Sequence, residues 1–264
     1  DIVTRYDIEA VHFDDYFYPY PITGVEFNDT LAFEKYAAVQ GFVVEGDPNA
    51  TDSVGQALYQ QNRKAVLGDW RRHNVELLIK QLNDTIKEIK PWVRFGISPF
   101  GIHRNKKDTP DSSGSNTNGL SNYDQLFADV PRWAEIGIID YVVPQLYWEI
   151  GHKRACYEVL INWWNDTWKR GHLYIGQSIS VFRKPDVNNP EINQTPAKMK
   201  LVRDLPNVHG NVWWPAWSLV RNSAGMQEKL RTNYQKTPAL APVYHWLDSK
   251  APKGVENLKA ENGK

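Results

Sequence analysis

The stretch Ala10-Val-His-Phe-Asp-Asp-Tyr-Phe-Tyr-Pro-Tyr-Pro21 joins a short apolar strand to two adjacent carboxylates and then to a run of aromatic side chains. Side chains alternate between the two faces of a strand, so Phe13 and Asp15 share one face, and His12 and Asp14 share the other. Phe13 suits a face covered by helices, which predicts that His12 and Asp14 line the opposite face. Asp15 reaches the same place only if the strand bends at its end.

The same order of a short apolar run and an amphipathic segment continues along the chain, which is the pattern of βα units in a parallel sheet. Helices are expected between the apolar runs, the clearest from Asp69 to Pro91, another from Ser121 or Asn122, and a third over residues 156–171. Two weaker helices are expected at 195–205 and 224–234. Five runs are predicted as strands: Ile8–Phe13, Trp92–Ile97, Ile139–Val143, Leu173–Gln177 and Asn211–Trp214.

Two long connections, Phe17–Gln61 and Ser98–Leu120, follow strands, whereas connections after helices are short. Long loops at the carboxyl ends of the strands are typical of (β/α)8 enzymes. We therefore predict an α/β fold of the (β/α)8 TIM-barrel type with only about five βα units, corresponding to strands four to eight. Residues 1–250 form this partial barrel, the first three strands are expected upstream, and the open sheet edges predict self-association.

Composition excludes several classes of function. Lys and Arg number 31, as do Asp and Glu, so no overall basic field is available for a nucleic acid. Neither a G-x-G-x-x-G nor a G-x-x-x-x-G-K-[ST] motif occurs, so a nucleotide ligand is not expected. The single Cys156 and the spacing of the histidines predict neither a metal nor another cofactor. Aromatic residues make up 12% of the chain, with 11 Trp, and we expect some rings to face a ligand.

Polar and aromatic side chains also follow the third and fifth predicted strands. The third strand leads into Gln145 and Glu149, and the fifth ends in the segment Val212–Trp217. Rings beside carboxylates suit sugars, because C–H faces stack on rings while hydroxyl groups bind to acids and amides. The alternatives are that some rings belong to the core and that Glu149 is a solvated loop acid. The predicted substrate-binding residues are His12, Tyr16, Tyr18, Arg71, Asn74, Ser98, Gln145, Tyr147, Trp148, Trp214 and Trp217.

Four segments together resemble one known family: His12–Pro19, Asp69–Val75, Phe95–Gly101 and Val143–Trp148. Their order and character resemble the bacterial glycosyl hydrolase-like 10 family, and the resemblance covers about residues 1–235. It implies a TIM barrel that acts on glycans, with peptidoglycan strands as one target, in a secreted, periplasmic or lipid-anchored protein. Residues 251–264 resemble a linker and the start of a fibronectin-III-like module.

The leading functional hypothesis is an O-glycoside hydrolase acting on a polysaccharide or a peptidoglycan glycan strand. Such hydrolysis normally uses two carboxyl groups across the scissile bond. Asp14 or Asp15 is the first candidate, Glu149 is the best second candidate, and a partner upstream of residue 1 stays open. Arg71 is alternatively a charge partner of either Asp. Two other hypotheses are a non-catalytic glycan-binding barrel and a polysaccharide deacetylase, which would need paired histidines that the sequence lacks.

Overall fold

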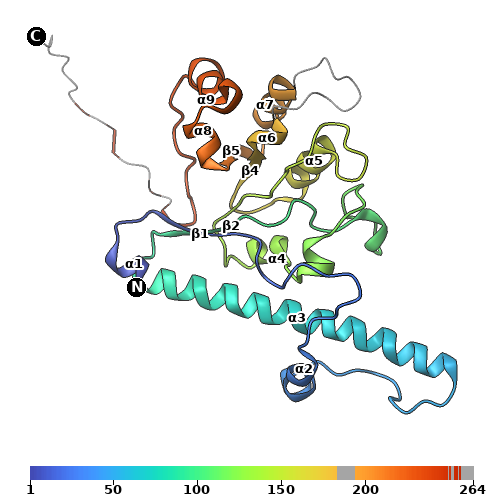
Figure 1. Ribbon diagram of the computed structural model, residues 1–264. Helices are drawn as coiled ribbons and strands as arrows, with labels where there is room; N and C mark the ends of the chain where they lie inside the picture. The colour runs from blue at the N-terminus through green and yellow to red at the C-terminus, as the bar shows by residue number, and fades with distance from the viewer. Residues whose placement is uncertain (183–193, 249, 251–252, 255, 257–264) are drawn as a thin grey trace, which may run out of the picture.

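The computed structural model describes residues 1–182, 194–248, 250, 253–254 and 256 (Figure 1). Five strands form a single sheet in the order β1-β2-β3-β4-β5, and every neighbouring pair is parallel. The predicted α/β fold is therefore confirmed, and the first and last strands are the two edges of this sheet. The strands are β1 Ala10–Phe13, β2 Arg94–Ile97, β3 Tyr141–Val142, β4 His172–Ser178 and β5 Val208–Trp214.

Helices connect the strands in the way that a parallel sheet requires. Strict sequence order of parallel strands, each followed by a crossover, is the arrangement of consecutive units in a (β/α)8 barrel. The helices are α1 Ile2–Arg5, α2 Thr30–Tyr36, α3 Ser53–Ile89, α4 Val130–Glu135, α5 Tyr157–Thr167, α6 Ile179–Phe182, α7 Gln194–Asp204, α8 Ala216–Val220 and α9 Met226–Lys229. In the described residues no helix is long and apolar enough to cross a membrane.

The main core lies between the sheet and the helices on its outer face. Phe95 and Ile97 of β2 are fully buried there, together with the large rings of Trp133 and Trp164 from α4 and α5. Because side chains alternate along β2, Arg94 and Gly96 lie on the other, concave face of the sheet. The concave face therefore carries the groups that a barrel would turn toward its interior.

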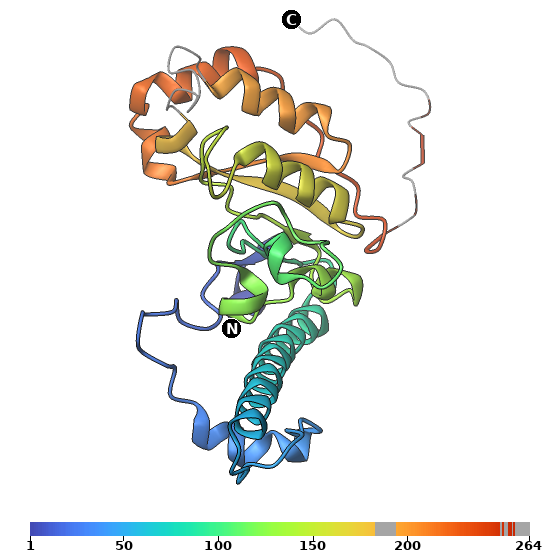
Figure 2. The same ribbon diagram turned by 90° about the vertical axis from the view of Figure 1, so that its right-hand side faces the viewer.

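Helix α3 begins earlier than the sequence predicts. It starts at Ser53 rather than at Asp69, where Asp52 caps it by accepting a hydrogen bond of 2.8 Å from the backbone N–H of Gly55. The loop after β1 is shorter for the same reason. Only the second half of α3 packs on the sheet, while its first half projects from the body and packs with α2 around Phe33 and Trp70 (Figure 2).

A second difference concerns the helix predicted from Ser121 or Asn122. The chain makes one wide π-type turn over Asn122–Leu126 and then interrupts it at Phe127, whose φ is 53°. Helix α4 follows only from Val130 onward. The segment is therefore two short pieces, because a left-handed residue ends the first of them.

The C-terminal segment returns to the amino end of the sheet, a contact that the sequence analysis does not predict. His172 Nε2 lies 3.1 Å from the carbonyl oxygen of Val243, and Arg94 donates a hydrogen bond of 3.0 Å to the Tyr244 hydroxyl. Trp246 Nε1 donates to Asp140 Oδ1 over 2.6 Å. The proposed module at 251–264 lies largely outside the described residues and stays a prediction.

Candidate active site

An aromatic floor lies on the concave face below the carboxyl ends of the strands. His12 of β1 stacks on Tyr141 of β3 with ring centroids 5.7 Å apart, and His12 Nδ1 lies 3.1 Å from the Tyr141 hydroxyl. The Tyr141 ring crosses Gly96 of β2 so closely that a Cβ there would lie 2.1 Å from it. Tyr174 of β4 completes the floor, with its ring edge-to-face on Tyr141 and the two ring centroids 6.0 Å apart. Burial lowers the pKa of His12, and the charge of Asp14 partly offsets this effect.

Asp14 stands above this floor at the end of β1. Gln145, which follows β3, donates from Nε2 to Asp14 Oδ1 over 2.6 Å and to the carbonyl oxygen of Ser98 over 3.1 Å. One amide therefore connects the ends of three neighbouring strands. Asp14 remains exposed to solvent on the concave side, the face that strand alternation predicts for it.

Asp15 has the opposite environment. It is 4% exposed, and the Tyr20 hydroxyl donates a short hydrogen bond to its Oδ2. Burial raises the pKa of Asp15, the neighbouring Asp14 raises it further, and the Tyr20 hydrogen bond offsets part of the increase. Tyr20 is a functional candidate that the sequence analysis does not single out, although it belongs to the aromatic run after β1.

An aromatic pair forms the wall next to Asp14. Tyr147 and Trp214 follow β3 and β5, and their rings are stacked with centroids 5.7 Å apart at an interplanar angle of 19°. Trp214 is 56% exposed, and Trp217, three residues later, is 57% exposed. Burial raises the pKa of Tyr147, and Asp14 and Asp15 raise it further, which places the Tyr147 hydroxyl within their field. The pair is a flat, open surface beside a carboxylate.

Several other predicted site residues are held elsewhere. Arg71 pairs with Asp29 through hydrogen bonds of 2.8 and 2.6 Å, and its guanidinium also lies over the rings of Tyr18 and Phe127. Burial raises the pKa of Tyr18, and the side chain of Asn74 is among the neighbours that lower it, so Asn74 belongs to the same cluster. This cluster connects the segment after β1 to α3. Arg71 therefore pairs with Asp29 rather than with Asp14 or Asp15.

The remaining predicted residues divide between the strand ends and the surface. Ser98 is buried and donates from Oγ to the carbonyl oxygen of Val143 over 2.9 Å, so its side chain supports β2 and β3. Trp148 packs against Phe100 at a centroid distance of 5.4 Å. Tyr16 is 80% exposed. Of the predicted rings, Tyr147 and Trp214 are the two that the structure brings into direct stacking.

Glu149 lies beside a buried lysine of α7. Lys198 is 1% exposed, and its Nζ donates to the carbonyl oxygen of Trp148 over 2.7 Å. Burial lowers the pKa of Lys198 to about 7, and the negative charge of Glu149 opposes that shift. Glu149 therefore has a cationic neighbour, whereas Asp14 and Asp15 are hydrogen-bonded to an amide and a phenol. Nothing in the sequence marks Lys198 as a site residue, because its position in the helical pattern is that of an ordinary helix residue.

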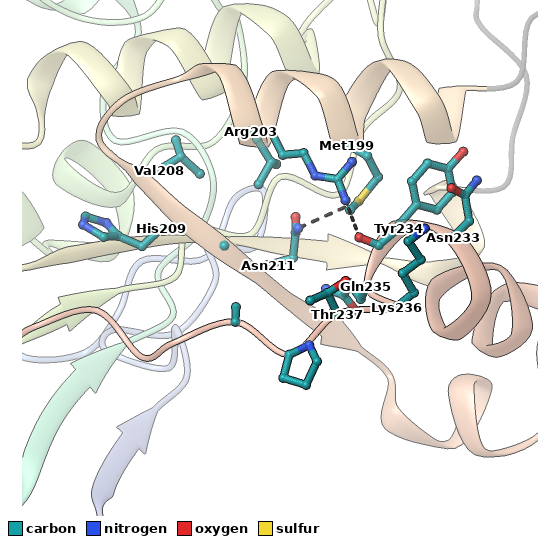
Figure 3. A pocket seen from close by; sticks show the side chains of 14 residues that line it. Met199, Arg203, Val208, His209, Asn211, Asn233, Tyr234, Gln235, Lys236 and Thr237 are labelled. Atoms are coloured by element: carbon teal, nitrogen blue, oxygen red, sulfur yellow. Dashed lines mark hydrogen bonds between the residues drawn. The ribbon is translucent and has the colours of Figure 1, made fainter. Parts of the chain in front are cut away.

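A cavity of about 700 Å³ lies elsewhere, between α7, β5 and residues 233–239 (Figure 3). Arg203 closes one side by donating to the carbonyl oxygen of Tyr234, and Asn211 Nδ2 lies 3.9 Å from Met199 Sδ. None of the predicted site residues is among the described residues that line it. The carboxylates and stacked rings instead share the open carboxyl edge of the sheet.

The fold and the carboxyl edge define an α/β protein with acids and stacked rings gathered where such enzymes bind substrate. The sequence profile of the family described as glycosyl hydrolase-like 10 matches residues 1–194. The chain belongs to this family, and the resemblance found in the sequence is confirmed.

Two curated relatives are similar over long stretches. Glycosyl hydrolase YngK of Bacillus subtilis (strain 168) is 40% identical over 270 residues, covering 100% of this chain and 48% of the relative. Glycosyl hydrolase DigH of Escherichia coli (strain K12) is 36% identical over 220 residues, covering 80% of this chain and 44% of the relative. The chain thus spans about half the length of the curated relatives it matches.

Among solved structures, bee venom hyaluronidase aligns with a TM-score of 0.37 and 10% identity, over 77% of this chain and 64% of that chain. The same enzyme in complex with a hyaluronic acid tetramer aligns with a TM-score of 0.36 and 12% identity, over 78% and 62% of the two chains.

Proposed function

We propose that the protein is a glycoside hydrolase that cleaves a polysaccharide or a peptidoglycan glycan strand, with Asp14 at the centre of its active site. The observation that carries the proposal is the Gln145–Asp14 hydrogen bond of 2.6 Å, which fixes an exposed carboxylate beside the Tyr147–Trp214 pair. Membership of the glycosyl hydrolase-like 10 family supports the same chemistry. We further propose that the protein acts outside the cytoplasm, where such glycans occur.

Hydrolysis of a glycosidic bond needs a proton donor for the leaving oxygen and a second carboxylate that acts as base or nucleophile. Asp14 is the group we assign to the substrate, with Gln145 holding its orientation. Asp15 supports it as a neighbouring acid, because burial raises the pKa of Asp15 and lets this side chain keep a proton. We assign the second carboxylate to Glu149, in the loop after β3.

The stacked rings supply the sugar-binding surface in this proposal. A flat ring covers the C–H face of a pyranose, and Trp214 leaves more than half of its surface open for that contact. Trp217 of α8 is a second exposed ring three residues after Trp214, and the Arg221 guanidinium lies 5.2 Å from its ring centroid. A chain of several sugars, rather than a single one, matches a surface of this kind.

Product analysis of the full-length protein tests the proposal directly. The substrates are a panel of polysaccharides and peptidoglycan strands stripped of peptides, and the products are separated by chromatography and mass spectrometry. We expect new reducing ends from the wild type and none from the Asp14→Asn, Asp15→Asn double variant. The matched control Asp84→Asn, which changes an exposed carboxylate of α3, should retain full activity.

The binding of glycans is measured in parallel, because it separates hydrolysis from recognition. A wild-type protein that binds a glycan, releases no product, and binds equally well after both substitutions would be a binding barrel instead. The exposed Trp214 and Trp217 rings are the observation that favours this second function.

A further inference from the structure

Lys198 is an unusual residue for its position. It belongs to α7, yet its side chain is 1% exposed and is among the largest fully buried side chains of the described residues. A buried ammonium group is costly unless hydrogen bonds or opposite charges compensate for its lost hydration. The groups that bind the Lys198 ammonium group therefore identify the part of the structure that this lysine fixes.

The first compensating group belongs to the loop after β3. Lys198 Nζ donates to the carbonyl oxygen of Trp148 over 2.7 Å, and the carboxylate of Glu149 interacts favourably with its charge. Four residues earlier in α7, Gln194 Oε1 accepts a hydrogen bond of 2.9 Å from the backbone N–H of Ile150. One turn of α7 thus holds the peptide groups on both sides of Glu149.

The second compensating group fixes the lysine itself. Lys198 Nζ lies 4.3 Å from the ring centroid of Tyr157, a distance at which a cation is attracted to the ring. Gln177 of β4 donates to the Tyr157 hydroxyl over 2.7 Å and to Asn211 Oδ1 of β5 over 2.9 Å. The lysine is therefore anchored to α5 and, through Gln177, to two strands of the sheet.

The loop that Lys198 holds carries two groups of the candidate active site. Tyr147 lies one residue before Trp148 and stacks on Trp214, and Glu149 lies one residue after it. A displacement of about 1 Å in a catalytic group can lower a rate by about a hundredfold. Movement of the peptide at Trp148 would shift both groups at once.

We propose that Lys198 is a positioning residue of the active site, which fixes the loop after β3 and with it the positions of Tyr147 and Glu149. This inference rests on the proposed glycoside hydrolase function for its kinetic consequences. Its structural part, the position of the Tyr147–Trp214 pair, does not depend on catalysis.

The test uses Lys198→Met in the full-length protein. Methionine fills a similar volume and removes a buried charge, so the melting temperature should stay the same or rise. Loss of the hydrogen bond frees the loop, so kcat should fall about tenfold to a hundredfold and KM should change less. The near-UV circular dichroism of the stacked pair should also be lost, and Tyr147→Ala is the reference variant in which the same loss is expected.

The control is Lys200→Met, two residues further along α7, where an exposed lysine pairs with Asp204. This variant should leave the rates and the spectrum unchanged. Wild-type kcat and an unchanged spectrum in Lys198→Met would overturn the inference and mark the lysine as a packing residue only. Should Lys198→Met fail to fold, Lys198→Gln and Gln194→Leu take its place, and normal kcat and spectra in both would equally overturn it.

The two hypotheses fail in different ways. A wild-type protein without hydrolytic activity on any glycan would contradict the proposed function, while the spectrum would still report whether Lys198 positions the ring pair. An active wild type whose rate and spectrum ignore Lys198 would contradict only the positioning role.

Discussion

The carboxyl groups at the ends of β1 and β3 lie in opposite electrostatic environments. At β1, Asp14 accepts from the amide of Gln145 and Asp15 accepts from the phenol of Tyr20, so both partners are neutral. At β3, Glu149 neighbours the buried ammonium group of Lys198. Burial raises the pKa of Asp15, although the Tyr20 hydroxyl stabilises its charged form, whereas the carboxylate of Glu149 has a cation as its neighbour.

This difference suggests how one edge of a sheet can supply both groups that glycoside hydrolysis needs. Burial raises the pKa of Asp15, and the charge of the adjacent Asp14 raises it further, so Asp15 takes up a proton more readily than an ordinary aspartate. Glu149 is the natural candidate for the base or nucleophile. The predictions below break or sharpen this contrast.

The largest effect is expected for Asp14→Asn. Asparagine keeps the shape and the contact with Gln145 but neither donates a proton to a leaving oxygen nor carries a charge. Because a positioned acid contributes about 10²–10⁴-fold to a rate, kcat should fall by that order while the glycan dissociation constant stays within about threefold. Steady-state kinetics and calorimetry measure the two quantities. Unimpaired kcat in both Asp14→Asn and Asp15→Asn would contradict the assignment of the catalytic acid to the end of β1.

Lys198 should also give stability a dependence on pH. Its pKa in the folded protein is about 7, below the usual 10.5, so folded protein releases this proton first as pH rises. The unfolded chain then holds more protons, and the free energy of unfolding rises between these two values by about 1.4 kcal/mol per pH unit. Below about pH 7, the lysine is charged in both states and contributes no slope.

Urea denaturation of the wild type and of Lys198→Met at pH 6 and pH 9 measures this contribution. Between pH 6 and pH 9, the free energy of unfolding should rise more in the wild type than in Lys198→Met. Glu149 and Cys156 also face the ammonium group, so both proteins carry Cys156→Ser to remove the thiol from the comparison. Equal shifts with pH in both proteins would contradict the assignment of a lowered pKa to Lys198.

The strands were predictable because each is a short apolar run that ends in polar residues. Strand alternation also predicts the face on which Asp14 lies, and the prediction of Gln145 as a binding residue gains a specific contact with Asp14. The first half of α3 was not predicted, because it lies away from the sheet and its apolar contacts are with Phe33 of α2. Helix propensity and the N-cap at Asp52 predict the start of this helix only weakly when its packing against α2 is not known.

Tyr20 and Lys198 show where sequence reasoning about the site ends. Tyr20 lies in the aromatic run after β1, but only the folded loop shows that its hydroxyl, rather than that of Tyr16 or Tyr18, reaches Asp15. Lys198 contacts Trp148 across 50 residues of sequence. A contact of that kind depends on how α7 packs on the loop, and no local pattern records it.

A smaller effect is expected from the stacked pair. Tyr147→Ala or Trp214→Ala should weaken glycan binding about tenfold, since each removes one ring of the surface, and the double variant should be less than additive. The coupling free energy measured by calorimetry should be about 0.5–1.5 kcal/mol, the range for aromatic pairs. Trp92→Ala is the matched control, because Trp92 is 59% exposed but lies before the amino end of β2. A loss of affinity in this control as large as in Trp214→Ala would contradict the assigned surface.

The smallest effect is expected from Tyr20→Phe, which removes the hydroxyl that donates to Asp15 and leaves the ring. That hydrogen bond stabilises the charged carboxylate, so its loss raises the pKa of Asp15 above its already elevated value. If the β1 pair must hold a proton for catalysis, the alkaline limb of the kcat profile should move up by about one pH unit or less.

The same substitution should change how stability depends on pH. A carboxyl group whose pKa is higher in the folded than in the unfolded protein stabilises the fold below about pH 4, and this contribution is lost as pH rises through the folded pKa. Between pH 3 and pH 7, the melting temperature should therefore fall more steeply with rising pH in Tyr20→Phe than in the wild type. Superimposable pH profiles of rate and stability would mean that Tyr20 does not tune the pair, and that the contrast between the two strand ends depends on Lys198 alone.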